Sequence, residues 1–321
     1  MDNAYVKKYI IKTGQGLQDV DHLKTSLYFQ KESARYINGD ISLDELDQLI
    51  TGYYKTKPVE TERTEEADII SVRIGQLISE NSFTFTVGQF VSIHAFLFKD
   101  ILTNAGKLRG YNFTKAEWVL DGKSVLYGDY RELACTLEYD FEVEKNYNYA
   151  GKSMDEIINH LSVFISNLWQ IHAFEEGNTR TTAVFVIKYL SSLGFNVSND
   201  TFAKNAWYFR NALVRANYND LYRGITENRS FLILFLRNLI LREDNVLKNR
   251  NLHVTECQPS FESRENRIIA LMRENPKITL DEIAGKLGVS VRTVKSIVAD
   301  LKDSGAVKRI SGKKYGYWDA N

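Results

Sequence analysis

An apolar helical pattern near the middle of the chain is broken by a short polar stretch. Residues 154–172 (MDEIINHLSVFISNLWQIH) place apolar side chains three and four positions apart, which predicts a core helix with Ser153 as its N-cap. The pattern stops at residues 173–177 (AFEEG) and resumes over residues 178–194, where Gly194 ends the second helix. Such a break indicates either an ordinary corner between two helices or a functional site.

Helical patterns recur along the chain, which contains only three prolines, so we expect a mainly α fold. Its 321 residues are enough for two domains. The 41 basic and 41 acidic residues balance, so no field of the whole protein attracts nucleic acid or membranes. The sequence shows no membrane span and no signal peptide, and Cys135 and Cys257 give no disulfide framework. These features favour a cytoplasmic protein.

Two polar stretches indicate domain boundaries. Residues 55–67 are charged and contain Pro58, and residues 243–262 lose the helical period. We therefore expect four parts, which are a helical N-terminal segment with a candidate regulatory role (1–66), a main body (67–245), a linker (246–262) and a small C-terminal unit (263–321).

A different pattern appears inside the main body. Over residues 108–133 (LRGYNFTKAEWVLDGKSVLYGDYREL), aromatic and β-branched residues alternate with polar ones on both sides of Asp121-Gly122, a turn dipeptide. This alternation predicts a β-hairpin.

The C-terminal unit has a recognisable layout. It shows a helix to about Asn275, a short helix ending at Gly288, a tight turn, a second helix capped by Ser290, and two short strands. The layout resembles a winged helix-turn-helix, a small α+β domain. From Glu262 onward, 12 basic residues exceed 8 acidic ones.

In that resemblance the second helix is a recognition helix, and the wing tip contacts phosphates. We predict DNA binding by residues 263–321, while a protein-binding role stays open. The candidate DNA-binding residues are Arg292, Thr293, Lys295, Ser296, Lys313 and Lys314.

The polar break in the main body carries the groups of a phosphate site. The residues that open the second helix after the flexible Gly177 are Asn178, Thr179 and Arg180. The free N–H groups of this first turn and the helix dipole form an anion cradle, to which Arg180 adds a charge. Glu176 would repel a phosphate unless a cation lies between them, which predicts Mg²⁺. His172 can accept a proton near neutral pH.

HAFEEGNTR, residues 172–180, resembles the signature of the Fic family, H-x-F-x-[D/E]-G-N-[G]-R-x-x-R. The resemblance extends over roughly residues 67–240, because SIHAFLFKDILTNAGKLR (92–109) is similar to the family's upstream helix and the expected hairpin lies where the family has its flap. A C-terminal winged helix is a common fusion partner in bacterial members. The resemblance implies a Fic-type helical bundle with a β-hairpin flap, followed by the winged-helix domain.

The family's activity would make this chain a protein adenylyltransferase. It would transfer AMP from ATP, its co-substrate, to a Ser, Thr or Tyr hydroxyl of a target protein docked along the flap. His172 would be the general base, Glu176 would bind Mg²⁺, and Phe174 would anchor the loop in the core. The phosphates would be bound by Gly177, Asn178, Thr179 and Arg180.

Three positions depart from the family pattern. Thr179 replaces the second glycine, and Ala173 stands where the family often has proline. Ala183 replaces the last motif arginine, which removes a charged contact to the γ-phosphate worth about 1.5–3 kcal/mol. The family's inhibitory motif is not found either, so we expect weak dependence on its release.

Two other functions stay open on this evidence. One is a transcriptional regulator whose degenerate Fic core senses a nucleotide or a partner. The other is a Fic transferase that uses a donor other than ATP. The sequence names neither the target protein nor the DNA site, and it leaves the oligomeric state open.

Overall fold

The computed structural model describes residues 3–56, 63–197, 200–254, 264–287, 289–310 and 316–320. Contacts divide the chain into two units, one made of Met1–Leu221 and Ile225–Thr255, the other of Tyr222–Gly224 and Glu256–Asn321. Both units are mainly helical, and the described residues contain one two-stranded sheet, in the second unit. The mainly α fold class is therefore confirmed.

The first unit is built mainly from helices, with a long connection between α5 and α6 over residues 99–132. Its α-helices are α1 (Asn3–Gly16), α2 (Leu27–Asn38), α3 (Leu43–Thr56), α4 (Thr64–Ser79), α5 (Val87–Phe98), α6 (Leu133–Lys145), α7 (Met154–Ile171), α8 (Asn178–Ser192), α9 (Thr201–Ala216) and α10 (Ser230–Leu241). Its short 3₁₀ segments are η1 (Leu17–Asp21), η2 (Trp118–Leu120) and η4 (Asn249–Asn251), while η3 (Leu221–Arg223) has residues in both units. None of the helices in the described ranges has the length and apolar character to cross a membrane.

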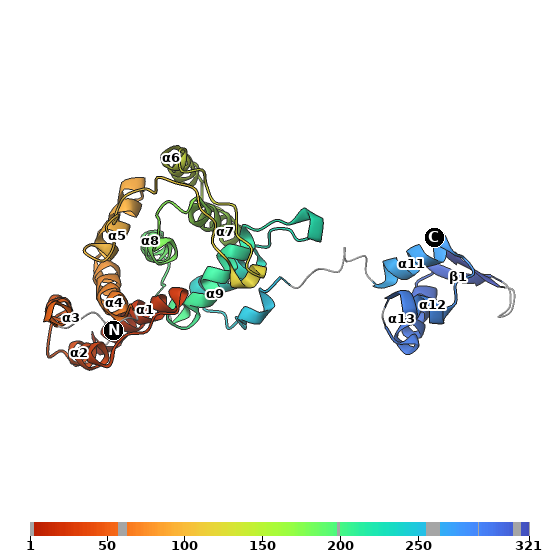
Figure 1. Cartoon of the computed structure of the whole chain (residues 1–321), viewed down its shortest axis with the longest axis horizontal. Helices are drawn as coiled ribbons and strands as arrows, with labels where there is room; N and C mark the ends of the chain where they lie inside the picture. Colours follow the sequence, from red (N-terminus) through yellow and green to blue (C-terminus); the bar gives the residue numbers. More distant parts are fainter. Residues whose placement is uncertain are drawn as a thin grey trace. The chain divides into compact units, whose positions relative to one another are not determined.

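Helix α8 is the central helix of the first unit. Every residue from Asn178 to Leu190 is buried. Helices α4, α5 and α7 and the segment η1 contact it, and Figure 1 shows α8 end-on with its neighbours arranged around it. The second half of the predicted helix pair is thus enclosed on all sides by the core.

The caps expected from the sequence are present. Ser153 and Glu156 form a reciprocal capping box at the start of α7. Gly194 takes the left-handed φ of 89° after α8. These signals are local in the sequence, which is why they predict helix ends reliably.

The N-terminal part of the chain packs against the rest of the first unit. Leu17 and Val20 lie in its main hydrophobic cluster. A Cβ at Gly14 would lie 2.3 Å from the carbonyl oxygen of Ser71, so α1 packs directly on α4. The predicted boundary after residue 66 falls inside α4 (Thr64–Ser79).

The first unit also extends further than predicted at its other end. Leu252 and Val254 are buried in the main core, and the Val254 N–H donates to the carbonyl of Val119 at 2.7 Å. The linker expected at 246–262 therefore begins later than predicted, and its residues 255–262 lie outside the described ranges.

The expected β-hairpin is a turn without strands. The chain reverses around Gly122, where the Glu117 N–H donates to the carbonyl of Lys123 at 2.9 Å, but no strand is assigned between residues 108 and 133. Other polar groups bind much of this backbone. The Gly128 N–H donates to the backbone carbonyl of Gln170 at 3.3 Å, and the Gln170 side-chain amide donates to the carbonyl of Leu126 at 3.0 Å. We call residues 110–128 the covering segment.

The second unit has the layout of a winged helix. Its elements are α11 (Arg264–Glu274), α12 (Leu280–Leu287), α13 (Val291–Asp303), β1 (Val307–Ile310) and β2 (Tyr317–Ala320). The strands pair antiparallel, with Val307 opposite Ala320. Trp318 closes the core and donates its indole N–H to the carbonyl of Ile278 at 3.0 Å. Ser290 caps α13 through the Thr293 N–H, as predicted.

Candidate functional site

His172 ends α7 in the left-handed conformation, with φ at 50°. Its ring packs against Phe113 and Tyr127 of the covering segment and against Trp169, and only 4% of the residue is exposed. Nδ1 is buried without a hydrogen-bond partner in the described part of the chain. Burial lowers the pKa of the ring well below 6.5, and the charge of Lys115 lowers it further. His172 is therefore a neutral imidazole at neutral pH.

Arg109 fixes the backbone around this histidine. Its Nε donates to the carbonyl of His172 at 2.7 Å, and its Nη1 donates to the carbonyl of Tyr111 at 2.7 Å. Its Nη2 donates to the carbonyl of Gly128. One buried guanidinium thus joins the end of α7 to both ends of the covering segment.

His94 of α5 fixes the other side of the loop. Its Nδ1 accepts from the Gly106 N–H at 2.8 Å, so its Nε2 carries the proton and donates to the carbonyl of Glu176 at 3.0 Å. The ring stacks on Phe174, with centroids 3.8 Å apart. Burial lowers the pKa of His94 to about 4. His94 is a positioning residue for the carboxylate-bearing end of the loop.

Gly177 allows the turn into α8. Its φ is 78°, and a Cβ would lie 2.2 Å from the ring of Phe98. No side chain caps α8 at this residue, although the Gly177 N–H donates to the carboxylate of Glu176 at 3.1 Å. The first turn of α8 therefore keeps the uncapped N-terminus that an anion site needs.

The next two motif residues are engaged within the protein. The Asn178 side chain closes the loop on itself, because it accepts from the Phe174 N–H at 2.9 Å and donates to the Phe174 carbonyl at 2.7 Å. The hydroxyl of Thr179 accepts from the indole N–H of Trp169 at 3.0 Å. Both side chains shape the loop, and their role toward phosphate stays a prediction.

Arg180 points away from the loop into the core. Nothing of it is exposed. Its Nη2 lies 2.8 Å from Glu66 and 2.9 Å from Asp21, and its Nη1 donates to Gln18 at 3.1 Å. The guanidinium also lies over the ring of Phe98, 4.9 Å from the centroid. In this conformation the arginine that was predicted to bind phosphate is bound by the N-terminal part of the unit.

Glu176 is a partly exposed carboxylate at the loop. Its Oε1 lies 3.9 Å from Nζ of Lys115, and each of these two side chains is 34% exposed. The described residues hold no group of three or more His, Cys, Asp or Glu side chains that could bind a metal alone. Mg²⁺ is commonly held by one carboxylate together with substrate phosphates, and Glu176 fits that arrangement.

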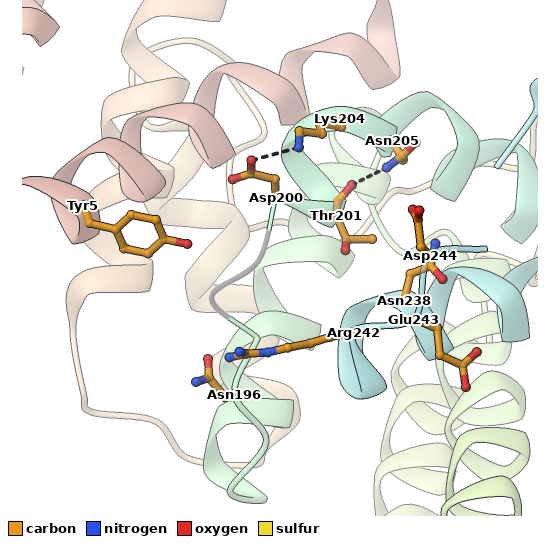
Figure 2. Close-up of a pocket in the computed structure, with 10 residues that line it drawn as sticks. All are labelled: Tyr5, Asn196, Asp200, Thr201, Lys204, Asn205, Asn238, Arg242, Glu243 and Asp244. Atoms are coloured by element: carbon orange, nitrogen blue, oxygen red, sulfur yellow. Dashed lines mark hydrogen bonds and ion pairs between the residues drawn. The ribbon is translucent and has the colours of Figure 1, made fainter. Parts of the chain in front are cut away.

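A separate polar cavity of about 550 Å³ lies away from the loop. Figure 2 shows its lining residues, which come from the start of α1, the chain before and within α9, and the end of α10 with the residues after it. Asp200 pairs with Lys204 at 3.0 Å, and Glu243 pairs with Arg237 outside the cavity lining. None of the motif residues reaches this cavity.

The predicted DNA-binding residues divide into three groups. Arg292, Lys295 and Ser296 are exposed on α13. Thr293 is partly buried, and its hydroxyl lies 2.8 Å from that of its capping partner Ser290. Two wing lysines lie outside the described ranges, Lys313 and Lys314.

Comparisons with known proteins agree with the two units. Residues 84–190 match the model of the Fic/DOC family, and residues 264–317 match that of an HTH domain. The chain therefore carries a Fic domain followed by a helix-turn-helix domain, as the sequence resemblance predicted. The HTH-type transcriptional regulator GolR of Listeria innocua is 39% identical over 49 residues, which are 15% of this chain and 19% of GolR.

Two solved structures are similar. A Fic family protein from Desulfovibrio desulfuricans G20 has a TM-score of 0.46 and 12% identity, with 98% of this chain and 87% of that chain covered. The N-terminal FIC domain of Bep8 from Bartonella sp. 1-1C has a TM-score of 0.43 and 17% identity, with 60% of this chain and 93% of that chain covered.

Several residues at the site were not predicted from the sequence. The sequence places His94 and Arg109 in the segment 92–109 that is similar to the family's upstream helix, but it indicates no role at the loop for them, for Lys115 or for Glu66. The sequence does contain one signal for such a residue, which is a polar side chain inside an apolar helical pattern, such as His94.

Proposed function

We propose that the chain is a Fic-type nucleotidyltransferase that moves AMP from ATP to a hydroxyl side chain of a target protein. The observation that carries the proposal is the pairing of an uncapped helix N-terminus with a neutral histidine on one short loop. Gly177 begins α8 without a side-chain cap, and His172 holds a buried ring nitrogen without a partner. The free N–H groups at the start of α8 can bind phosphate oxygens, and the free ring nitrogen of His172 can accept a proton.

The reaction would use the loop as follows. The target hydroxyl oxygen forms a bond to the α-phosphorus, the bond from that phosphorus to pyrophosphate breaks, and His172 takes the hydroxyl proton. A neutral imidazole is needed for this role, and burial keeps His172 neutral. The first-turn N–H groups of α8 would bind the phosphate oxygens, which places the reacting atoms and offsets charge.

Glu176 would hold Mg²⁺ together with the phosphates, and the ion would offset the charge that develops on the leaving pyrophosphate. The Glu176 carboxylate is exposed enough for this and makes only a long contact to Lys115. His94 would keep the Glu176 backbone in place while the carboxylate changes partners.

The covering segment supports a role in target binding. Phe113 and Tyr127 lie over His172, so the segment must move for a hydroxyl to reach the ring. It exposes large apolar side chains at Tyr111, Trp118 and Leu126. When the segment moves, its backbone contacts to Gln170 and Ser124 would open, and a target strand could pair with the released groups through main-chain hydrogen bonds.

The second unit would bind DNA through α13. Arg292, Lys295 and Ser296 are exposed on one helix of a helix-turn-helix. The chain's match to GolR covers about a fifth of that protein, and GolR is an HTH-type transcriptional regulator, which agrees with a DNA-binding role.

A second candidate function follows from the engaged motif residues. Asn178, Thr179 and Arg180 all have internal partners, and Arg180 is fully buried. A Fic core in this state would bind a nucleotide or a partner without transferring it, and the protein would be a transcriptional regulator.

One experiment separates these two functions. The full-length chain is incubated with labelled ATP, GTP, CTP and UTP and Mg²⁺, with and without a cell extract that supplies targets, and protein-bound label is measured. The variants are His172→Ala and, as a matched control, His253→Ala, whose ring pairs with Asp121 away from the loop at 3.3 Å. We expect label from ATP that is lost only in His172→Ala.

The other results have clear meanings. Label from a nucleotide other than ATP would mean that the protein is a transferase with a different donor. No label from any donor, together with tight binding to the promoter of its own gene, would overturn the transferase in favour of the regulator.

A further inference from the structure

A triphosphate bound at α8 needs positive charge near its tail, and the motif does not provide it. Ala183, where the family pattern has its last arginine, is fully buried in the core. Arg180 is bound by Glu66, Asp21 and Gln18 and has no exposed surface. In the described conformation, neither position on α8 presents a cation to a ligand.

The other arginines around the loop are also bound. Arg63 forms two hydrogen bonds of 2.7 Å to Glu66. Arg210 forms two hydrogen bonds to the buried Glu117, at 2.6 and 3.1 Å. Arg109 donates to backbone carbonyls, including that of His172. Moving Arg210 or Arg109 to a phosphate would leave a buried carboxylate or backbone carbonyls unpaired. Arg63 would give up both of its hydrogen bonds to Glu66.

Lys115 differs from all four. Its Nζ lies 3.9 Å from Glu176, which is longer than a hydrogen bond, and its side chain is 34% exposed. The backbone of Lys115 is held in place, because its N–H donates to the hydroxyl of Ser124 at 3.0 Å. Its charge also reaches His172 and contributes to the lowered pKa of that ring. A cation with free donors thus lies beside both groups of the candidate site.

We propose that Lys115, on the covering segment, binds the phosphate tail of the nucleoside triphosphate and supplies the charge that Ala183 cannot. This inference rests on the proposed nucleotide-binding function. Lys115 would make the site prefer a triphosphate over a monophosphate. An ammonium on a flexible stem can follow a phosphate without leaving a buried partner behind. Because the lysine lies on the covering segment, the ligand's tail would also hold that segment over the site.

The test measures equilibrium binding to the full-length chain, with Mg²⁺ present, for ATP, inorganic tripolyphosphate and AMP. The variants are Lys115→Met, which removes the charge, and Lys115→Arg, which keeps it. Lys123→Met is the matched control, because it lies on the same segment and pairs with Asp220 at 2.7 Å. Thermal unfolding of each variant checks that the fold is retained.

We expect Lys115→Met to weaken ATP and tripolyphosphate binding by about tenfold or more, and to change AMP binding little. Lys115→Arg should stay within about threefold of wild type, since the charge is kept. Lys123→Met should bind all three ligands like wild type.

Two results would overturn the inference while the proposed function stands. One is unchanged ATP binding in Lys115→Met. The other is an equal loss of affinity for ATP and for AMP, which would mean that the lysine does not bind the phosphate tail. A wild-type chain that binds neither ATP nor another nucleoside triphosphate would overturn the proposed function and this inference together.

Discussion

Arg180 of the candidate site and Glu66 of α4 form an ion pair at 2.8 Å in the interior of the first unit. The pair joins the signature loop to the N-terminal part of the chain, 114 positions away in the sequence. Asp21 adds a second carboxylate at 2.9 Å to the same nitrogen. The residue that the family pattern assigns to phosphate thus contributes to the core in this conformation.

Arg180→Met should lower the free energy of unfolding by about 3–5 kcal/mol, because it leaves buried carboxylates without their cation. Arg63→Met is the matched control. Arg63 pairs with the same Glu66, but its side chain is 47% exposed, so the loss should be at most about 1 kcal/mol. Urea unfolding measures both. Equal losses for the two variants would mean that the buried Arg180–Glu66 pair contributes no more to stability than the exposed Arg63–Glu66 pair.

The two buried histidines predict how stability depends on pH. The folded state lowers the pKa of His172 well below 6.5 and that of His94 to about 4, so the unfolded chain binds more protons between these values. Stability should therefore fall as the pH drops from about 6.5 toward about 4.

His94 alone accounts for about 3 kcal/mol of this loss, from about 1.4 kcal/mol per pKa unit. Urea unfolding of wild type and His94→Gln from pH 7 to pH 4 measures the difference. The variant should be less stable at pH 7 and should lose less on acidification. Parallel curves for the two proteins would contradict the assignment of the slope to His94.

The features predicted correctly from the sequence are local ones. Helix ends follow from residues a few positions apart, such as Ser153 with Glu156, and the apolar period of α7 and α8 predicts core helices. The partners of Arg180 lie in η1 and α4, and nothing in the local pattern points to them. The burial of α7 and α8 was predicted, but the polar side chains that are buried with these helices were not.

The covering segment shows why the hairpin prediction was wrong. Alternating aromatic and polar residues are compatible with any extended chain that has one buried side. Here Tyr127 and Phe113 turn toward His172, while backbone groups at Leu126 and Gly128 bind Gln170 of α7. With those groups already bound, a regular ladder does not form.

The close contact of α1 with α4 predicts opposite effects at two helical glycines. Gly14→Ala would bring a methyl group to 2.3 Å from the carbonyl oxygen of Ser71, so we expect a loss of about 1–3 kcal/mol or more. Gly52→Ala, in α3, meets nothing within 4 Å and should gain about 0.5–1 kcal/mol. Thermal unfolding compares them. A neutral Gly14→Ala would mean that the two helices can separate without cost.

DNA binding by the second unit predicts a change in salt dependence. Each of Arg292→Ala and Lys295→Ala should weaken binding, and where the lost contact is to phosphate the slope of log K against log salt should decrease by about 1. The control is Lys31→Ala, on the exposed surface of α2. Fluorescence anisotropy with duplex DNA at several salt concentrations gives the slopes. Identical slopes for all three variants would place the DNA contact elsewhere.

Helix α8 is buried from its first residue to Leu190, and its N-terminus is the candidate phosphate site. A ligand bound there therefore contacts the same helix whose burial defines the folded core. The free energy of ligand binding should therefore increase the free energy of global unfolding, rather than only order a surface loop. Hydrogen exchange of amides throughout α8 would then slow on nucleotide binding, and so would the exchange of other amides in the core of the first unit.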